Sequence, residues 1–445
     1  MVHLVFLKVI DSDKLTEENI STYIPRAEIQ LDEIKDEVQG IINDLIKGRD
    51  NDIVNKNQFY GADGFKKQDI KASEDEINEA YNRIDPKLLN ALRYAKKNLI
   101  KFHKAQIREK WSIEIEKGVK VGQVYRPLES VGIYIPGGQA IYVSTVLMAA
   151  TPAHIAGVKE IIICTPPQLG RRFAPEILVA AKEFGINKIY NVGGATAIAA
   201  MTFGTETIPR VQKIIGPGNR YVTAAKQLLS HIVAIDNPAG PSEVLIIADK
   251  TANYRYVILD LISQIEHAPD NVGILISDSS ELIEKVSNNI DSFIKNSERN
   301  KIIELALENH SLVIKANDIE DCVRISNLIA PEHLEILIEN PNDVIEMINN
   351  AGAIFIGEYS PVPLGDYCAG TNHILPTGGS AKVYSGLSIN DFMKTIDILE
   401  CNKEGLKVLS TAASTIAEFE GLFAHKKSIE ERLKDTWGKK KPLND

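Results

Sequence analysis

Apolar residues recur at two different spacings along this chain of 445 residues. Residues 31–46 carry them at helical spacing, and a second amphipathic helix is predicted to begin at Pro86. Residues 113–121 alternate apolar and polar positions around Gly118, which predicts a hairpin. From Val131 onward the pattern changes to short, wholly apolar runs separated by helical segments.

Short apolar runs with helices between them are typical of parallel strands buried on both faces of a sheet. Nine such runs are more strands than a single sheet usually contains. A proline-containing interruption at residues 236–242 divides them into two groups. We therefore expect an α/β fold with two doubly wound, mainly parallel Rossmann-like sheets and small helical segments at the N- and C-termini. The predicted strands are 131–135, 160–164, 188–192, 213–215, 244–248, 272–276, 312–314, 334–338 and 353–356. Helices are predicted between most of them, for example over 141–155, 175–184 and 219–229.

The composition is that of an ordinary globular protein, with 44% hydrophobic and 25% charged residues. A net charge of -10 and the lack of a basic stripe argue against nucleic-acid binding. No apolar run approaches the roughly 18–20 residues that span a bilayer, and the N-terminus does not read as a signal peptide. The four cysteines are scattered, with no CxxC pair. We expect a cytoplasmic protein with no membrane partner.

Polar residues suited to acid–base and metal chemistry gather in four clusters. A carboxylate directly precedes a histidine at Glu332-His333, which places two proton carriers of different pKa at one point of the backbone. The other clusters are Gln264 with His267, Asp366 with His373, and Glu420 with His425. Gln264 and His267 stand three positions apart at the end of a helix predicted over 254–267, so both side chains are expected to leave the same face. Asp366 is expected in a glycine-flanked loop. Imidazoles, a carboxylate and an amide oxygen suit Zn²⁺, with Mn²⁺ or Co²⁺ as substitutes. Gln is an uncommon zinc ligand, so chemistry alone favours only His267, Asp366 and His425, and any one histidine is more often structural.

Three glycine-rich loops follow predicted strands and precede predicted helices. Backbone N–H groups in such loops can hold a phosphate at the carboxyl edge of an open sheet. The loops are 136–138 (PGG), 193–194 (GG) and 216–219 (GPGN). None has the G-x-G-x-x-G spacing of a dinucleotide site, so they indicate either a nucleotide of unspecified identity or tight turns.

Eight segments, in this order along the chain, carry a resemblance to a known family. They are 132–138 (GIYIPGG), 192–195 (VGGA), 216–219 (GPGN), 239–243 (AGPSE), 264–267 (QIEH), 330–334 (APEHL), 370–373 (GTNH) and 424–426 (AHK). Together they resemble the histidinol dehydrogenase family over roughly residues 30–435. The resemblance implies a zinc-dependent homodimer that oxidises L-histidinol to L-histidine through L-histidinaldehyde. That reaction reduces two NAD⁺ and forms the last steps of histidine biosynthesis.

The resemblance also implies a role for individual residues. Glu332 and His333 match the catalytic acid–base pair. One zinc ion per subunit is expected on Gln264, His267, Asp366 and His425. Substrate contacts are expected from these four ligands and His333, together with Ser242, His373 and Glu420. Cofactor contacts are expected from Tyr134, Thr196 and Asn219, although Thr196 replaces the Gln that the family usually has. A shorter side chain at Thr196 predicts a weaker hold on NAD⁺.

Four parts are expected along the chain. Residues 1–30 form an N-terminal arm. Residues 31–133 with 242–387 form a first α/β domain. The resemblance implies that this domain contains the metal and catalytic residues. Residues 134–241 form a second, NAD-binding α/β domain. Residues 388–445 form a small helical C-terminal domain. The resemblance implies that this domain reaches across a homodimer, so that active sites are shared.

Two other functions remain open from the sequence. One is a related zinc- and NAD-dependent dehydrogenase acting on a sulfonated or other polyol. An acidic site disfavours an anionic substrate of that kind. The other is a catalytically inactive homologue that serves as a binding or regulatory subunit, although Glu332 and His333 are both present.

Overall fold

The computed structural model describes residues 7–24, 26, 31–137, 141–168, 172–237, 240–295 and 297–434. The chain divides into two compact units, and each is described by itself. Unit 1 comprises Met1–Gln106 and Leu128–Phe392, and unit 2 comprises Ile107–Pro127 and Met393–Asp445. The nine strands predicted from apolar runs are all present, and all belong to unit 1.

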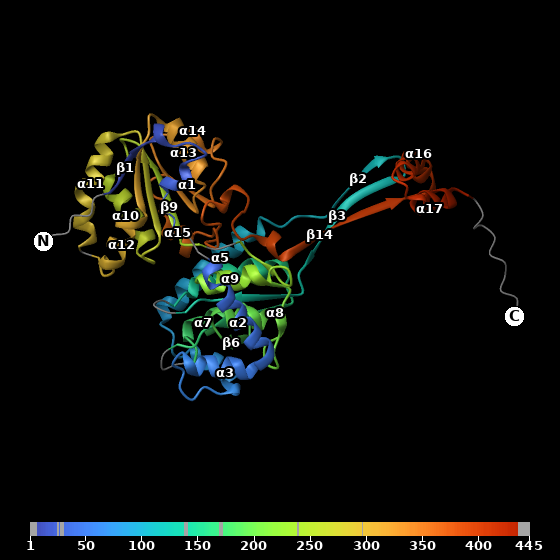
Figure 1. Ribbon diagram of the computed structural model, residues 1–445, viewed down its shortest axis with the longest axis horizontal. Helices are drawn as coiled ribbons and strands as arrows, with labels where there is room; N and C mark the ends of the chain where they lie inside the picture. Colours follow the sequence, from blue (N-terminus) through green and yellow to red (C-terminus); the bar gives the residue numbers. More distant parts are fainter. Residues whose placement is uncertain are drawn as a thin grey trace. The chain divides into compact units, whose positions relative to one another are not determined.

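A six-stranded sheet forms one half of unit 1, with strand order β1-β11-β10-β9-β12-β13 and parallel pairing throughout (Figure 1). Its strands are β1 (Val9–Asp11), β9 (Glu243–Ala248), β10 (Val272–Ser277), β11 (Ser311–Lys315), β12 (His333–Leu337) and β13 (Ala353–Ile356). Every residue of β9, β10 and β12 is buried, as the continuous apolar runs predicted. Strand β9 leads to β10 and β11 on one side, and β12 lies on its other side, so the order reverses between β9 and β12.

Helices cover both faces of this sheet. Helices α10 (Tyr254–Ile265), α11 (Ser280–Ile294) and α12 (Asn300–His310) share one apolar core with it. Helices α1 (Ile20–Tyr23), α13 (Ile319–Ile329) and α14 (Asn342–Ile345) share the core on the opposite face. A short helix, α15 (Val362–Tyr367), packs through its first residue against the α10 side.

A five-stranded parallel sheet forms the other half of unit 1, in the order β6-β5-β4-β7-β8. Its strands are β4 (Ser130–Tyr134), β5 (Glu160–Thr165), β6 (Lys188–Asn191), β7 (Lys213–Ile215) and β8 (Ala234–Ile235). Strand β4 leads to β5 and β6 on one side, whereas β7 lies on its other side. The carboxyl ends of β4 and β7 therefore form the topological switch point where open α/β sheets bind ligands.

The helices on the five-stranded sheet differ from the expected domain division. One face is covered by α4 (Glu74–Ala80), α5 (Pro86–Lys104), α6 (Val143–Ala156) and α7 (Pro175–Lys182). The other is covered by α2 (Leu31–Gly48), α3 (Asp50–Phe59), α8 (Gly194–Phe203) and α9 (Arg220–Leu229). We expected residues 31–133 to pack with 242–387. The apolar faces of α2 to α5 instead share their cores with β4, β5 and β6.

Unit 2 contains an antiparallel sheet in the order β14-β3-β2 and two helices (Figure 1). The elements are β2 (Trp111–Glu116), β3 (Val119–Pro127), β14 (Met393–Cys401), α16 (Lys403–Phe419) and α17 (Phe423–Leu433). The predicted hairpin around Gly118 is present. We expected the C-terminal segment to be helical. That prediction was wrong for residues 393–401, because β14 pairs with β3 along nine residues.

Helix α5, with 19 residues, carries Lys and Arg along its length. Across the described residues, no helix combines the length and apolar character that crossing a bilayer requires.

Candidate active site

Glu332 and His333 lie at the amino end of β12, directly after a sharp change of chain direction. Helix α13 ends at Ile329, and Ala330 follows in the left-handed region with φ of 54°. That conformation costs a non-glycine residue roughly 1–2 kcal/mol. The turn brings His333 opposite Val244, at the amino end of β9.

The backbone of Glu243 contacts both residues of the pair. Its N–H donates to Oε2 of Glu332 at 2.8 Å, and its carbonyl oxygen lies 3.1 Å from Nδ1 of His333. Because a carbonyl only accepts, the Nδ1 atom must carry the proton. In the neutral ring the lone pair is therefore on Nε2, which is buried and makes no hydrogen bond with a described residue. This tautomer is the one that a base acting through Nε2 requires.

Two carboxylates flank the imidazole of His333. Oε2 of Glu332 lies 3.5 Å from Nδ1, and Oδ1 of Asp366 lies 3.5 Å from Nε2. Burial lowers the pKa of His333, but the charges of Glu332 and Asp366 outweigh burial and raise the pKa well above its ordinary value. Burial likewise raises the pKa of Asp366, and its interactions with His333, His373 and His267 reverse that effect and lower the pKa. Both carboxylates therefore stabilise the positive charge that the imidazole of His333 gains when it accepts a proton.

Asp366 and His373 are joined through the backbone. The structure places Asp366 in helix α15 and not in a loop. Its carbonyl oxygen lies 3.0 Å from Nδ1 of His373, and Nε2 of that ring lies 3.3 Å from the hydroxyl of Thr145 on α6. Burial lowers the pKa of His373 despite the nearby Asp366, so this ring favours the neutral form. His373 thus connects the catalytic sheet to a helix of the five-stranded sheet.

Gln264 and His267 lie at the end of α10, but not on one helical face as expected. The helix ends at Ile265, so His267 lies in the bend that follows. The side chain of Gln264 is buried and that of His267 is exposed. The charge of His267 nevertheless acts on Asp366, which places the two in one electrostatic neighbourhood. Within the described parts of the chain, no group of three or more His, Cys, Asp or Glu side chains is arranged to hold a metal.

The remaining expected substrate residues fall in both units. Ser242 is half-buried and directly precedes Glu243. Glu420 and His425 belong to unit 2, where Glu420 ends α16 and His425 lies on α17. Both side chains are exposed within their unit.

The expected cofactor residues lie around the carboxyl edge of the five-stranded sheet. The hydroxyl of Tyr134, at the end of β4, accepts the N–H of Gly194 at 3.1 Å, and burial raises the pKa of Tyr134 to about 12. Thr196 is buried in α8. Asn219 is exposed, and its Oδ1 accepts N–H groups of the first turn of α9. Of the glycine-rich loop at 136–138, Gly138 lies outside the described residues.

Gly216 begins the loop that leads to Asn219, and its backbone is held on both sides. Its φ is 122°, and an added Cβ would lie 2.1 Å from the carbonyl oxygen of Tyr134. Its N–H donates to Asp236 at 2.7 Å, and its carbonyl accepts from Lys226 at 2.8 Å. Lys226 and Asp236 also form a buried ion pair. The loop approaches β4 so closely that only glycine fits at this position.

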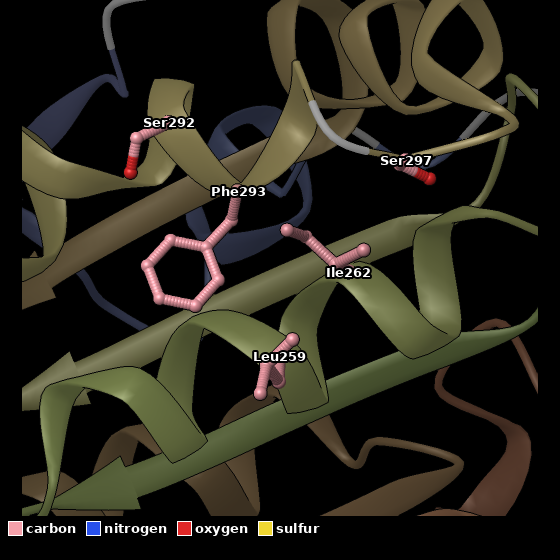
Figure 2. Close-up of a pocket in the computed structure, with 5 residues that line it drawn as sticks. All are labelled: Leu259, Ile262, Ser292, Phe293 and Ser297. Atoms are coloured by element: carbon pink, nitrogen blue, oxygen red, sulfur yellow. The ribbon is translucent and has the colours of Figure 1, made fainter.

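The cavity drawn in Figure 2 is separate from all these residues. It has a volume of about 430 Å³ and is lined by Leu259, Ile262, Ser292, Phe293 and Ser297. Figure 2 shows Phe293 extending from α11 toward α10, which carries Leu259 and Ile262. Its lining is mainly apolar and includes no ionisable side chain, so it lacks groups for acid–base chemistry.

Glu243 and Arg26 also position the catalytic pair, and neither was predicted from the sequence. The carboxylate of Glu243 is buried and pairs with Arg26 at 2.7 Å, and Arg26 also donates to the carbonyl of Ile329. Burial raises the pKa of Glu243 although Arg26 opposes the shift. The only sequence signal was a charged residue at the start of an otherwise apolar strand.

A buried histidine with a fixed tautomer, two flanking carboxylates and glycine-rich loops on a neighbouring parallel sheet define an α/β enzyme with acid–base chemistry. A histidinol dehydrogenase family model matches residues 24–433. The chain is 45% identical over 425 residues to the histidinol dehydrogenase of Methanothermobacter thermautotrophicus, covering 95% of this chain and 99% of the relative. It is 42% identical over 427 residues to that of Lactococcus lactis, covering 96% and 99%.

A solved structure gives the same result. The crystal structure of histidinol dehydrogenase from Elizabethkingia anophelis superposes with a TM-score of 0.92 at 40% identity, covering 96% of this chain and 98% of the other. The chain belongs to the histidinol dehydrogenase family.

Proposed function

We propose that this protein oxidises L-histidinol to L-histidine through L-histidinaldehyde with two molecules of NAD⁺, in the last steps of histidine biosynthesis. Family membership supports the reaction. The mechanism is inferred from the orientation of His333. With Nδ1–H held by the carbonyl of Glu243, Nε2 is the atom that accepts a proton. A base so held typically contributes about 10²–10⁴-fold to the rate.

The proposed course uses His333 twice and Glu332 once. Nε2 of His333 takes the hydroxyl proton of histidinol as hydride leaves the same carbon for NAD⁺, which gives the aldehyde. Glu332 then helps a water molecule to add to the aldehyde by accepting a proton from it. His333 takes a proton from the hydrate as the second hydride leaves, which gives the carboxylic acid. The substrate is a cation, and the carboxylates of Glu332 and Asp366 complement its charge.

We further propose a zinc ion on Gln264, His267, Asp366 and His425. The donor chemistry fits a borderline metal ion, since it combines two imidazoles with a carboxylate and an amide oxygen. Three of the proposed donors, Gln264, His267 and Asp366, belong to unit 1, and His425 belongs to unit 2. When bound, the ion would orient the amine and imidazole of the substrate and offset the charge of Asp366, so that the pKa of His333 lies nearer its ordinary value.

NAD⁺ is proposed to bind at the carboxyl edge of the five-stranded sheet. The glycine-rich loops after β6 and β7 lie at this edge, and the switch point between β4 and β7 is where such sheets bind ligands. Gly216 and Gly193 both approach their neighbours too closely for a Cβ. Tyr134, Thr196 and Asn219 are the proposed contacts. The connection from His373 to α6 supports a substrate bound beside this edge.

A homodimer with shared active sites is proposed from unit 2. Its strand β2 is exposed along its whole length, β14 is exposed from Lys394 onward, and α17 has no buried residue. The exposed side chains include many large apolar ones, such as Ile398, Leu399 and Phe419. Apolar surface on this scale is typical of a subunit interface. A second copy of the chain would cover it and could supply Glu420 and His425.

The test is NADH formation with histidinol, compared with a panel of alcohols that includes sulfonated and neutral polyols. We expect histidinol to be oxidised with the highest kcat/KM, and His333→Asn to abolish most of that turnover. Preference for a polyol, or no NADH from any member of the panel, would contradict the proposal.

A further inference from the structure

A buried histidine with no part in the proposed mechanism lies next to the segment that carries His373. His103 is in the last turn of α5, and its side chain is fully buried. Its Nδ1 lies 2.8 Å from Oε1 of Gln106, and its Nε2 lies 3.3 Å from Nδ2 of Asn372. The ring therefore connects a helix of the five-stranded sheet to the residue that directly precedes a proposed substrate contact.

The contact with Gln106 fixes the tautomer of His103. Oε1 of Gln106 also accepts the backbone N–H of Ile389 at 3.3 Å, which identifies this atom as the carbonyl oxygen of the amide. Because a carbonyl oxygen only accepts, Nδ1 of His103 must carry the proton. In the neutral ring the lone pair is then on Nε2. Burial lowers the pKa of His103, which favours this neutral form.

The amide of Asn372 is fixed in the same way by backbone groups. Its Oδ1 accepts the N–H of Ile374 at 2.9 Å, and its Nδ2 donates to the carbonyl of Met148 on α6 at 2.8 Å. The second N–H of Nδ2 faces Nε2 of His103, which accepts it. Every hydrogen-bonding atom of this buried amide side chain thus has a partner, and His103 completes the set.

The chain before Asn372 also lies against α5. The side chain of Asn98 donates to the carbonyl of Cys368 at 2.9 Å. Gly370 has a φ of 117°, and an added Cβ would lie 3.1 Å from the carbonyl oxygen of Asn98. The backbone that leads from α15 to His373 is therefore placed by contacts with α5, and Asn372 is the point at which His103 acts on it.

We propose that His103 is a positioning residue for substrate binding, which orients the amide of Asn372 and so holds the neighbouring His373 where it contacts the substrate. This inference deepens the proposed function and rests on it for the role of His373. His103 is enclosed by the protein and does not touch the substrate. Its effect passes through Asn372.

Kinetics of His103→Leu test the positioning role. Leucine fills much of the space of the ring but leaves one N–H of Asn372 buried without an acceptor. KM for histidinol should rise by about 10–100-fold, because a small misplacement of a contact has effects of this size. The change in kcat should be smaller, and KM for NAD⁺ should stay at the wild-type value. His103→Gln returns an acceptor for Asn372 and should recover most of the lost affinity.

Leu99→Ala is the matched control, one helical turn earlier on α5 and equally buried. It creates a cavity in the core, so it should lower the urea midpoint at least as much as His103→Leu does. It leaves the contacts of Asn372 intact, so KM for histidinol should remain that of wild type. A residue with a merely structural role would change stability alone.

Ring signals of histidines labelled with ¹⁵N test the placement of His373 without any activity. Wild type should show His103 protonated at Nδ1 and not at Nε2, with the signal assigned by its loss in His103→Gln. The signals of His373, assigned with His373→Asn, should shift in His103→Leu and stay unchanged in Leu99→Ala. Should His103→Leu not fold, Gln106→Leu removes the acceptor of the Nδ1 proton and should shift the same signals and raise the same KM.

The proposal is overturned if folded His103→Leu protein keeps the wild-type KM for histidinol, if the His373 signals do not move, or if Leu99→Ala raises KM equally. Failure of the proposed function gives a different result, namely wild-type protein with no histidinol turnover. The ring signals report on the position of His373 in either case.

Discussion

Replacing Lys226 with Met tests whether the proposed cofactor loop depends on a buried ion pair. Lys226 and Asp236 have side chains only 5% and 6% exposed, and between them they bind both the carbonyl and the N–H of Gly216. Lys226→Met leaves the carboxylate of Asp236 buried without its partner. Removing one partner of a buried pair costs about 3–5 kcal/mol, much more than the pair itself contributes.

A second substitution separates charge from packing. Asp236→Asn in the Lys226→Met background keeps an acceptor for the N–H of Gly216 and removes the unpaired charge. Most of the lost stability should return in this double variant, because neutral replacements of a buried pair are often tolerated. Lys285→Met, which breaks an exposed pair with Glu281 on α11, is the matched control and should leave the midpoint at the wild-type value.

Two assays measure the effect. Urea unfolding should show the loss in Lys226→Met and its recovery in the double variant. Kinetics should show KM for NAD⁺ raised by about tenfold or more in Lys226→Met, equivalent to ~1.4 kcal/mol of binding free energy, with KM for histidinol unchanged. The reasoning fails if Lys226→Met costs less than about 1 kcal/mol, or if the double variant is no more stable than the single one.

Further outcomes are expected at the metal site, at the catalytic pair and at the proposed shared site. Chelation should abolish turnover and added Zn²⁺ or Mn²⁺ should restore it, whereas full activity of metal-free protein would exclude the proposed metal site. His333→Asn should lower alcohol and aldehyde oxidation each by about 10²–10⁴-fold; Glu332→Gln should impair aldehyde oxidation at least as much as alcohol oxidation, and the reverse order would remove Glu332 from the hydration step. Mixed His333→Asn and His425→Asn chains should regain part of the activity as heterodimers, while verified heterodimers without activity would place each site within one chain.

Most of the parallel strands were predictable because they are apolar runs, and the central ones are buried on both faces. The short, partly exposed strands β1 and β8 were not among those predicted. Strand β14 was not predictable either, since its residues from Lys394 to Cys401 are exposed and its pairing with β3 depends on backbone groups that no side-chain pattern reports. The end of α10 was misjudged by two residues for a similar reason. Apolar spacing continues to Ile265, and the sequence alone does not show that His267 leaves the helix.

The catalytic pair was predictable from its motif, but its surroundings were not. Glu243 acts on Glu332 and His333 through backbone atoms, which carry no sequence signature. Arg26 and Glu243 are 217 positions apart, and their ion pair forms only when the chain folds. Buried charges in apolar strands were the available clue, and their partners required the fold.

The number of NADH molecules formed per histidinol at completion tests the central claim most directly. One His333 base serving two hydride transfers, with hydration by Glu332 between them, predicts two NADH and one histidine for each histidinol consumed. A ratio of one with free aldehyde accumulating would contradict the account, because it would show an alcohol dehydrogenase that stops after the first transfer.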